Sequence, residues 1–534
     1  GLPTQRGAVY RRLTEHLGAV IGVEFLSFQQ FTYRVLTAEQ SVKPLLVGSA
    51  RLVAVAEALL HTGGVPSPGE ARLFNDAIAE AKRYGLTPSD VAALAQHDPE
   101  RTRLARVFAA YEAEQGEMWD FDDARDALRA RLATGKRLAN LEPNLVIVDG
   151  FREFAPTELE ILTGLARQVN IHVALREAPR GLTPEYTYNA IPVEQVEEYS
   201  APNPVAELRY VFSRVKEQLI AGVPQADIAI VVPEGRTHAA EVVASEFGVP
   251  VHDEQPRSLA ETHEGRLLSN LLTLAGTPTA SHLLAIPALA PLAGELLTTN
   301  VAGADAIHII AERHGVAAEW QRWYDLLSAE DAAFAWANEL VREVLPTLTS
   351  DLTPTWQNKA LSAAQEAAKL GTGEAFREWW LALLEHTFER VDTPSGVALL
   401  TTPRIANRQF RVAYVTGASR GAYSTFEQED YFVPEEQRSA EGEGLPVRYA
   451  GRDDDLFTEL RTRADHLIVT APAADQGGGH PAEPQLLHHP APLPAYAVGS
   501  PLIPATEPYH APFEPLALSP KPSVEFLRQY SVCP

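Results

Sequence analysis

Cysteine is nearly absent from this chain, since Cys533 is the only one among 534 residues. A single thiol allows neither an intramolecular disulfide nor a complete thiolate metal site. The sequence also has no run of eighteen apolar residues, and no basic stretch followed by an apolar core opens it. We therefore expect no membrane span and no secretory signal. These absences favour a soluble protein of the reducing cytoplasm.

Positive charge is in deficit, because 45 lysines and arginines oppose 70 acidic residues and leave a net charge of −25. This balance argues against a protein coated in basic residues for indiscriminate DNA binding, although a local basic groove is compatible with it. Residues 401–420 contain four arginines and no acidic residue. They predict such a groove, in which Arg404, Arg408 and Arg411 contact DNA phosphates. An equal alternative is a set of solvated arginines that flank a strand.

The chain also lacks a phosphate-binding loop, because Gly-x-x-x-x-Gly-Lys-Ser/Thr occurs nowhere in it. The backbone amides and the lysine of that loop cradle nucleotide phosphates. Methionine occurs once, at Met118, and the chain begins at Gly1, so we expect the natural translation start to lie upstream. Either the loop lies upstream as well, or the protein never had one. In both cases we expect this chain not to hydrolyse ATP efficiently.

Apolar runs and helical periodicity predict an α/β protein. Hydrophobic residues make up 45% of the 534 residues, which is enough for three or four packed domains. Six apolar runs predict the strands of this α/β pattern, and the first three of them predict buried strands. They lie at 144–149, 169–175, 227–232, 396–400, 411–415 and 466–470. Because residues 37–140 and 265–390 have helical spacing instead, the pattern predicts two α/β cores, each split by a helical insertion.

Asp149 ends the first of these apolar runs, at the carboxyl end of a predicted parallel strand, where such sheets bind ligands. In a nucleotide-hydrolysing motor this acid would hold Mg²⁺, and the next residue would be a glutamate that orients water. Here the next residue is Gly150. The segment Val148-Asp-Gly-Phe-Arg-Glu-Phe-Ala-Pro-Thr-Glu-Leu-Glu160 strongly resembles AddB-type subunits of bacterial helicase–nucleases, in which Asp-Gly-Phe and Pro-x-Glu replace the Asp-Glu pair. An alternative is an acid that caps the next turn.

Two further segments resemble superfamily 1 helicases. Leu456-Phe-Thr-Glu-Leu-Arg-Thr-Arg-Ala464 is similar to their Thr-Arg-Ala motif, whose arginine, here Arg463, reaches towards the γ-phosphate. A planar guanidinium can bind a phosphate bidentately, although Glu459 is an alternative partner. Residues 406–438 resemble the stretch that links motifs V and VI, with Gln409 where a glutamate is usual. Asn407 and Ser424 also depart from the usual glycine and proline. The resemblance therefore implies a degenerate nucleotide site formed by Asp149, Gln409 and Arg463.

The last segment of the chain is rich in proline. Residues 471–522 contain thirteen prolines and predict an extended linker that lies over a neighbouring domain or in solvent. His480, His488 and His489 have no accompanying carboxylate pair or cysteine, so we interpret them as loop histidines. Residues 522–534 resemble the opening of the AddB-type nuclease domain. By that resemblance Cys533 is the first ligand of an iron–sulfur cluster whose other cysteines lie beyond this sequence.

Over nearly its whole length the chain resembles the helicase-like part of such a subunit. The resemblance implies two RecA-like domains with helical insertions, which clamp a nucleotide between them in active helicases. It also implies DNA and a helicase–nuclease partner subunit as binding partners, no membrane, and a role in double-strand-break repair and recombination. The implied boundaries are 1–36 with 141–197 for domain 1A, 37–140 for insertion 1B, 198–264 with 391–470 for domain 2A, 265–390 for insertion 2B, 471–522 for the linker and 523–534 for the start of the nuclease domain.

Two other functions stay open at this stage. One is an active ATP-dependent helicase and exonuclease whose phosphate loop and nuclease domain lie outside this chain. The other is an acidic scaffold that binds protein, which suits the charge but leaves the arginine-rich strip and the motif order unexplained. For the subunit as a whole, the resemblance implies an iron–sulfur cluster and Mg²⁺. This chain alone is expected to hold no cofactor, and ATP binding is expected to be degenerate.

Overall fold

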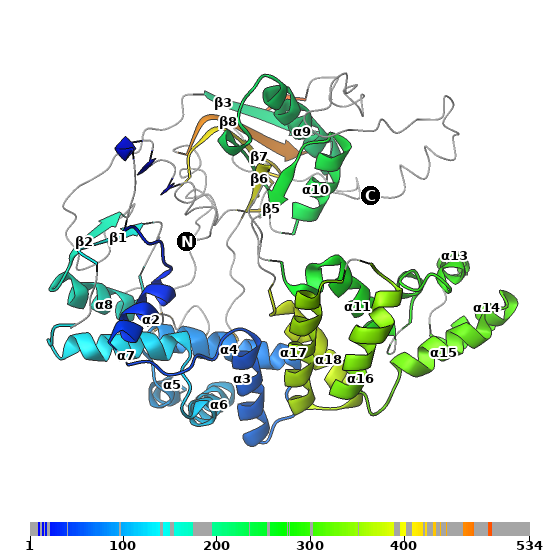
Figure 1. Cartoon of the computed structure of the whole chain (residues 1–534), viewed down its shortest axis with the longest axis horizontal. Coiled ribbons are helices and arrows are strands. Elements are labelled where there is room, and N and C mark those ends of the chain that lie inside the picture. Colours follow the sequence, from blue (N-terminus) through cyan, green and yellow to red (C-terminus); the bar gives the residue numbers. More distant parts are fainter. Residues whose placement is uncertain are drawn as a thin grey trace.

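A computed structural model gives the structure of the chain. It describes residues 9–10, 13–14, 16–18, 22–39, 41–95, 98–138, 143–149, 154–174, 195–233, 235–253, 257–274, 276, 278–299, 303–350, 352–388, 396–401, 408–419, 422–423, 431–433, 438, 445, 463–474 and 490–493. Among the described helices, none is both long and apolar enough to cross a lipid bilayer. The fold is of the α/β type, with parallel strands and many helices (Figure 1).

The described part of the chain contains helices and parallel strands in the following order. The helices are α2 (Phe28–Ala38), α3 (Ser49–His61), α4 (Pro68–Arg83), α5 (Pro88–Leu94), α6 (Pro99–Gln115), α7 (Phe121–Ala133), α8 (Pro156–Ala166), α9 (Pro204–Ile220), α10 (Thr237–Glu246), α11 (His263–Leu274), α12 (Ala280–Leu283), α13 (Ala290–Thr299), α14 (Ala304–Arg313), α15 (Ala317–Leu327), α16 (Phe334–Glu339), α17 (Pro354–Leu370) and α18 (Gly373–Glu385). The strands are β1 (Leu145–Asp149), β2 (Asn170–Ala174), β3 (Gln195–Ala201), β4 (Ile228–Val231), β5 (Val251–Asp253), β6 (Val397–Leu400), β7 (Phe410–Val415), β8 (Ala464–Pro472) and β9 (Ala491–Pro492).

Seven strands form one parallel sheet in the order β5-β6-β4-β7-β8-β3-β9. Every residue of β4 and β6 is buried, because α9 and α10 pack on one face and a second apolar cluster covers the other. A strand that is buried on both faces needs a continuous apolar sequence, as these strands have. The buried strand predicted at 227–232 is therefore confirmed as β4, and the α/β strands predicted at 396–400, 411–415 and 466–470 are confirmed as β6, β7 and β8.

β1 and β2 pair in parallel in a separate sheet, from Leu145 opposite Asn170 to Asp149 opposite Ala174. Val146 packs against a core formed with α2, α7 and α8, and Val148 is buried. The prediction that β1 is buried on both faces was wrong, since 66% of Ile147 is exposed. Side chains alternate along a strand, and these three helices cover only one face of this pair.

The two helical segments share a single hydrophobic core. Buried residues of α3, α4 and α6 belong to the same apolar cluster as those of α11 to α18. Helices α3 and α17 pack against each other, and Arg72 of α4 forms an ion pair with Glu385 of α18. In Figure 1 these helices lie side by side below the seven-stranded sheet. Residues 37–140 and 265–390, which the sequence presents as separate insertions, thus depend on each other for burial.

A short part of the predicted linker lies along the edge of the large sheet. Ala491 and Pro492 pair in parallel with Tyr199 and Ser200, and Leu493 donates its N–H to the carbonyl of Ser200 at 3.1 Å. The Leu493 side chain is buried in the core beneath α9. Residues 490–493 are therefore an edge strand with its flanking residues. This strand pairs with β3 and covers backbone groups of β3 that would otherwise be exposed at the sheet edge.

Candidate functional site

Gln409 and Arg463, both predicted to contact nucleotide, lie next to each other at the amino ends of β7 and β8. The N–H of Phe410 donates to the carbonyl of Arg463 at 2.8 Å, and Phe410 is opposite Ala464 in the parallel register. Neighbouring strands are about 4.8 Å apart, so the two preceding residues are adjacent as well. Gln409 is exposed and Arg463 is half-buried. The sheet thus brings together two residues that are 54 positions apart in the sequence.

Two of the three predicted DNA-binding arginines lie at the same amino end. The guanidinium of Arg408 lies 5.0 Å from the centroid of the Phe410 ring and is largely buried, which is the geometry of a cation–π contact. Arg411 occupies an outward-facing position of β7 and is exposed. Arg404 lies outside the described residues. Of the pair that is described, Arg411 is therefore the one that presents a guanidinium to solvent.

Asp149 ends β1 in the other sheet, where its backbone is paired with that of Ala174. This position, at the carboxyl end of a parallel strand, is where the sequence expected it. Gly150 and Cys533 lie outside the described residues. The described part of the chain contains no group of three or more metal-ligating side chains.

Sequence reasoning missed Glu207, a carboxyl group buried at the carboxyl edge of the seven-stranded sheet. Glu207 lies in the first turn of α9, and its Oε1 accepts hydrogen bonds from the Gly417 N–H at 2.7 Å and the Thr470 hydroxyl at 2.6 Å. Burial raises the pKa of Glu207 to about 7, although both hydrogen bonds and the charge of Arg236 oppose that rise. An acid in the first turn of a helix is ordinary, so the sequence carries no signal of this burial.

Glu207 connects the loop that follows β7 to the carboxyl-terminal part of β8. Tyr423 is buried beside it, and its hydroxyl lies 3.1 Å from the carbonyl of Val231 at the end of β4. Carboxyl ends of parallel strands are the usual place for ligand-binding loops, and a carboxyl group that titrates near neutral pH suits such a place. Because Glu207 has almost no exposed surface, its direct effect is on how the loop after β7 is held against β8.

A second contact missed by the sequence connects the large sheet to the helices. The residues between β7 and β8 that the structure describes at 431–433, 438 and 445, here called the strap, lie against α4, α5 and α6. Arg438 donates to both carboxylate oxygens of Glu80 at 2.8 and 2.9 Å, and its Nε donates to the Val433 carbonyl at 3.1 Å. Two parallel N–H···O bonds of this kind are both strong and directional.

Phe432 anchors the strap in the helical core. Its ring is buried and lies 4.9 Å from that of Phe74 in an edge-on arrangement. Arg101 of α6 donates its Nε to the Phe432 carbonyl at 2.6 Å, which satisfies a backbone group that is removed from water. The strap, which lies between β7 and β8 in the sequence, therefore packs against the helical body through Phe432 and Arg438.

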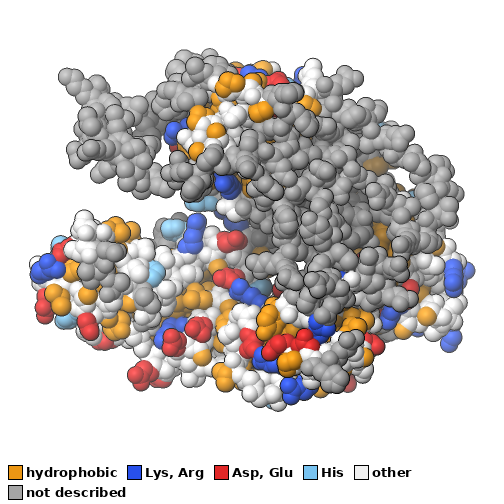
Figure 2. Space-filling view, turned by 180° about the vertical axis from the view of Figure 1, so that it is seen from behind, with side chains coloured by type: hydrophobic (Ala, Val, Ile, Leu, Met, Phe, Trp, Pro, Cys, Tyr) orange, Lys and Arg blue, Asp and Glu red, His pale blue; other side chains and the backbone are white. Residues whose placement is uncertain are grey.

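Charge on the visible surface of the helical body is mixed. In Figure 2, acidic and basic side chains are interspersed over the described helices, without a large area of one sign. Basic side chains therefore occupy local positions on this surface, although acidic residues outnumber basic ones in the whole sequence. No protein-family model matches the chain, and no curated protein matches it closely enough to count as a relative.

Proposed function

We propose that this chain is a helicase-like DNA-binding subunit of a helicase–nuclease that acts in double-strand-break repair and recombination. In this proposal its two α/β units are RecA-like, each carries a helical insertion, and the nucleotide site between them is degenerate. The chain then scans or holds DNA while a partner subunit provides the motor. The resemblance of residues 148–160 to AddB-type subunits and of residues 456–464 to superfamily 1 helicases supports this proposal, together with the parallel seven-stranded sheet.

The observation that carries the proposal is that Gln409 and Arg463 directly precede the paired residues Phe410 and Ala464 at the amino ends of β7 and β8. Two motifs that were recognised separately in the sequence meet at neighbouring positions of one sheet. In superfamily 1 helicases the corresponding motifs act on one nucleotide, so their adjacency is what the proposal requires.

Three features of the sequence support a nucleotide site without efficient hydrolysis. No Gly-x-x-x-x-Gly-Lys-Ser/Thr loop occurs in the 534 residues, Gly150 follows Asp149, and Gln409 stands where a glutamate is usual. Phosphoryl transfer depends on positioned cations and an oriented water molecule, and these substitutions remove several such groups at once. Asp149 is the residue that would ligate Mg²⁺ here, and it would supply a single carboxylate.

The DNA contacts and the cluster are further parts of the proposal. Arg404, Arg408 and Arg411 would contact phosphates, with Arg411 as the exposed member among those that the structure describes. A four-iron cluster needs four thiolates, and Cys533 supplies one. These residues alone do not fit a complete cluster, so a cluster would require cysteines of a longer polypeptide.

The test is steady-state ATP hydrolysis by the chain in the presence of single-stranded DNA, with DNA binding measured on the same preparation. We expect DNA binding that weakens steeply with salt, because phosphate neutralisation releases counterions. We expect no hydrolysis above background. A turnover in the range of about 1 to 100 per second, as working phosphoryl-transfer enzymes show, would instead favour an active helicase. Absence of DNA binding at low salt would remove the proposal.

A further inference from the structure

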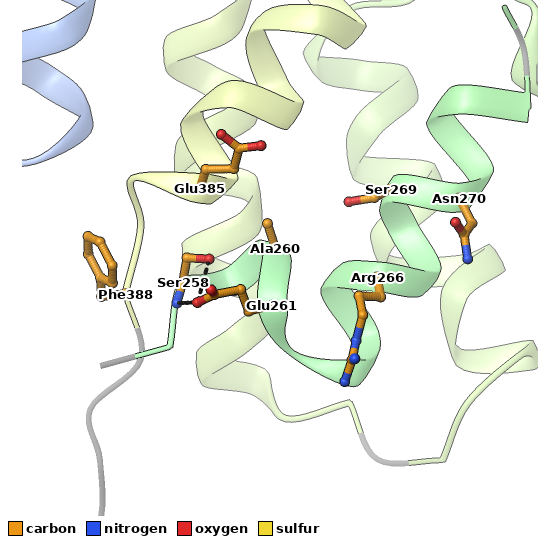
Figure 3. Close-up of a pocket in the computed structure, with 8 residues that line it drawn as sticks. All are labelled: Ser258, Ala260, Glu261, Arg266, Ser269, Asn270, Glu385 and Phe388. Carbon is orange, nitrogen blue, oxygen red and sulfur yellow. Dashed lines mark hydrogen bonds between the residues drawn. The ribbon is translucent and has the colours of Figure 1, made fainter. Parts of the chain in front are cut away.

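A hollow of about 600 Å³ lies where the large sheet joins the helical body, between residues 258–261, the first turns of α11 and residues 385–388 (Figure 3). Its volume falls within the range of about 300–1,000 Å³ that small-ligand sites occupy. Both chain connections between the sheet and helices α11 to α18 pass along it. No residue of the proposed nucleotide site lines this hollow.

Backbone contacts connect the two chain segments that line the hollow. Ser258 and Phe388 form an antiparallel bridge, and the Leu259 N–H donates to the Thr387 carbonyl at 2.7 Å. Gly265 packs so closely on this connection that a Cβ there would lie 1.6 Å from the Leu259 carbonyl oxygen. A site with a fixed backbone loses little conformational entropy when a ligand binds.

Among the charged side chains that line the hollow, that of Arg266 is available to bind an anionic ligand. Both acidic residues that line it are engaged, since Glu261 accepts hydrogen bonds from the backbone and hydroxyl of Ser258 at 2.9 and 3.1 Å, and Glu385 is paired with Arg72. Arg266 is exposed, and its guanidinium makes no ion pair or hydrogen bond within the part of the chain that the structure describes. Lys359 adds positive charge at the rim, where its Nζ donates to the Phe388 carbonyl at 2.8 Å.

Two neutral donors stand beside this cation. Ser269 and Asn270 follow Arg266 by three and four positions on α11, so each of them is a neighbour of Arg266 on the helix surface. Arg266 and Asn270 project in the same direction in Figure 3, and both Ser269 and Asn270 line the hollow. Arginine, serine and asparagine are residue types that contact DNA phosphates.

An aromatic ring completes the site. Phe388 is 50% exposed at the opposite side of the hollow, although phenylalanine is usually buried. Exposed rings beside cations provide stacking platforms for unpaired bases, and such stacking tolerates any base.

We propose that this hollow binds single-stranded DNA, with Arg266, Ser269 and Asn270 holding a phosphodiester and Phe388 stacking on an adjacent base. This inference rests on the proposed DNA-binding function and assigns part of it to the junction between sheet and helices. A free nucleotide presents the same phosphate and base, so the experiment includes both sources.

The test measures binding of the full chain to a fluorescent oligothymidylate, and separately to free thymidine monophosphate, for the wild-type chain and matched variants. We expect Arg266→Ala and Phe388→Ala each to weaken oligonucleotide binding about tenfold, as loss of a charge-assisted contact or of a base stack does. Arg266→Ala should also reduce the slope of log affinity against log salt by about 0.7. Arg322→Ala and Phe334→Ala remove an exposed arginine and a partly exposed phenylalanine elsewhere on the helices and should have no effect.

Cross-linking supplies a readout that does not depend on affinity. An oligonucleotide containing 5-iododeoxyuridine should photo-cross-link to the peptide that contains Phe388, and Phe388→Leu should abolish the cross-link. Oligonucleotide binding that is unchanged in both site variants, without a cross-link, would overturn the inference and leave the proposed function standing. A wild-type chain that binds no oligonucleotide would overturn both. Binding of the free nucleotide alone, lost in Arg266→Ala, would replace the DNA strand by a nucleotide as the ligand and overturn the inference as stated.

Discussion

Arg438→Ala should detach the strap from the helical body while the large sheet stays folded. The Arg438 side chain is fully buried and that of Glu80 is 16% exposed, so the substitution leaves an unpaired carboxylate at a nearly closed site. Breaking a buried ion pair in this way costs about 3–5 kcal/mol. Because water can reach part of Glu80, we expect the lower end of that range, about 3 kcal/mol.

This free energy sets the expected exchange of backbone amides. A loss of about 3 kcal/mol raises the open population of the strap by about 100-fold, since each 1.4 kcal/mol is a factor of ten. Amide hydrogen exchange followed by mass spectrometry should show that loss of protection in residues 431–433, with a smaller loss in α4. Strands β4 and β7 should keep the protection they have in the wild-type chain.

Two further variants make the result specific. Arg209→Ala removes a two-bond contact to Glu246 of similar geometry, but both side chains are 28% exposed, and we expect a loss of less than about 1 kcal/mol. Exchanging Arg438 for methionine and Glu80 for leucine together should restore most of the protection, since apolar residues can replace a buried pair. Unchanged exchange of the strap in Arg438→Ala would refute the reasoning, and so would an equal loss across the whole sheet.

Three other predictions follow from the described contacts. The pKa of Glu207 is raised from 4.5 to about 7 in the folded chain, so the folded state binds this proton more tightly than the unfolded state, and the stability of the wild-type chain falls as pH rises through that range. Denaturant titrations between pH 4.5 and 7.5 should therefore show the stability of Glu207→Gln rising by about 3 kcal/mol relative to that of the wild-type chain. A stability difference that stays constant over this pH range would contradict the prediction. Gly265→Ala should lower the melting temperature or prevent folding, because the new Cβ would overlap the Leu259 carbonyl. Gly294→Ala, which has open space around it in α13, should instead stabilise the chain by up to about 1 kcal/mol, and equal effects of the two substitutions would refute the close packing at Gly265. Arg411→Ala should weaken DNA binding and flatten its salt dependence in a chain that melts normally, and unchanged affinity would class Arg411 as a solvated arginine.

The α/β core was predictable because its strands are buried on both faces. A run such as Ile228–Val231 has no polar residue to place in solvent, so its amino acids predict both a strand and its complete burial. The run that ends at Asp149 looks the same in sequence, yet Leu145 and Ile147 are exposed. Hydrophobicity alone does not say whether an element exists to cover the second face.

The contacts that define the candidate sites were harder to predict because they are made by single side chains across long separations. Gln409 and Arg463 were found through motifs, and their adjacency follows from strand order. Arg438 and Glu80 are 358 positions apart, and each is an ordinary surface residue type. Glu207 resembles any acid in a first helical turn. Burial changes the chemistry of these residues, and burial is a property of the assembled fold.

The shared core of the two helical segments limits how either segment can be shortened, exchanged or expressed alone. A domain inserted into a host usually carries its own core, so it can be trimmed, exchanged or expressed alone. Here α3, α4 and α6 bury their apolar faces against helices that the chain supplies some two hundred residues later. A fragment with only one of the segments would expose a broad apolar surface and aggregate. Neither segment is a portable module, and any rearrangement that shortens one has to reshape the other at the same time.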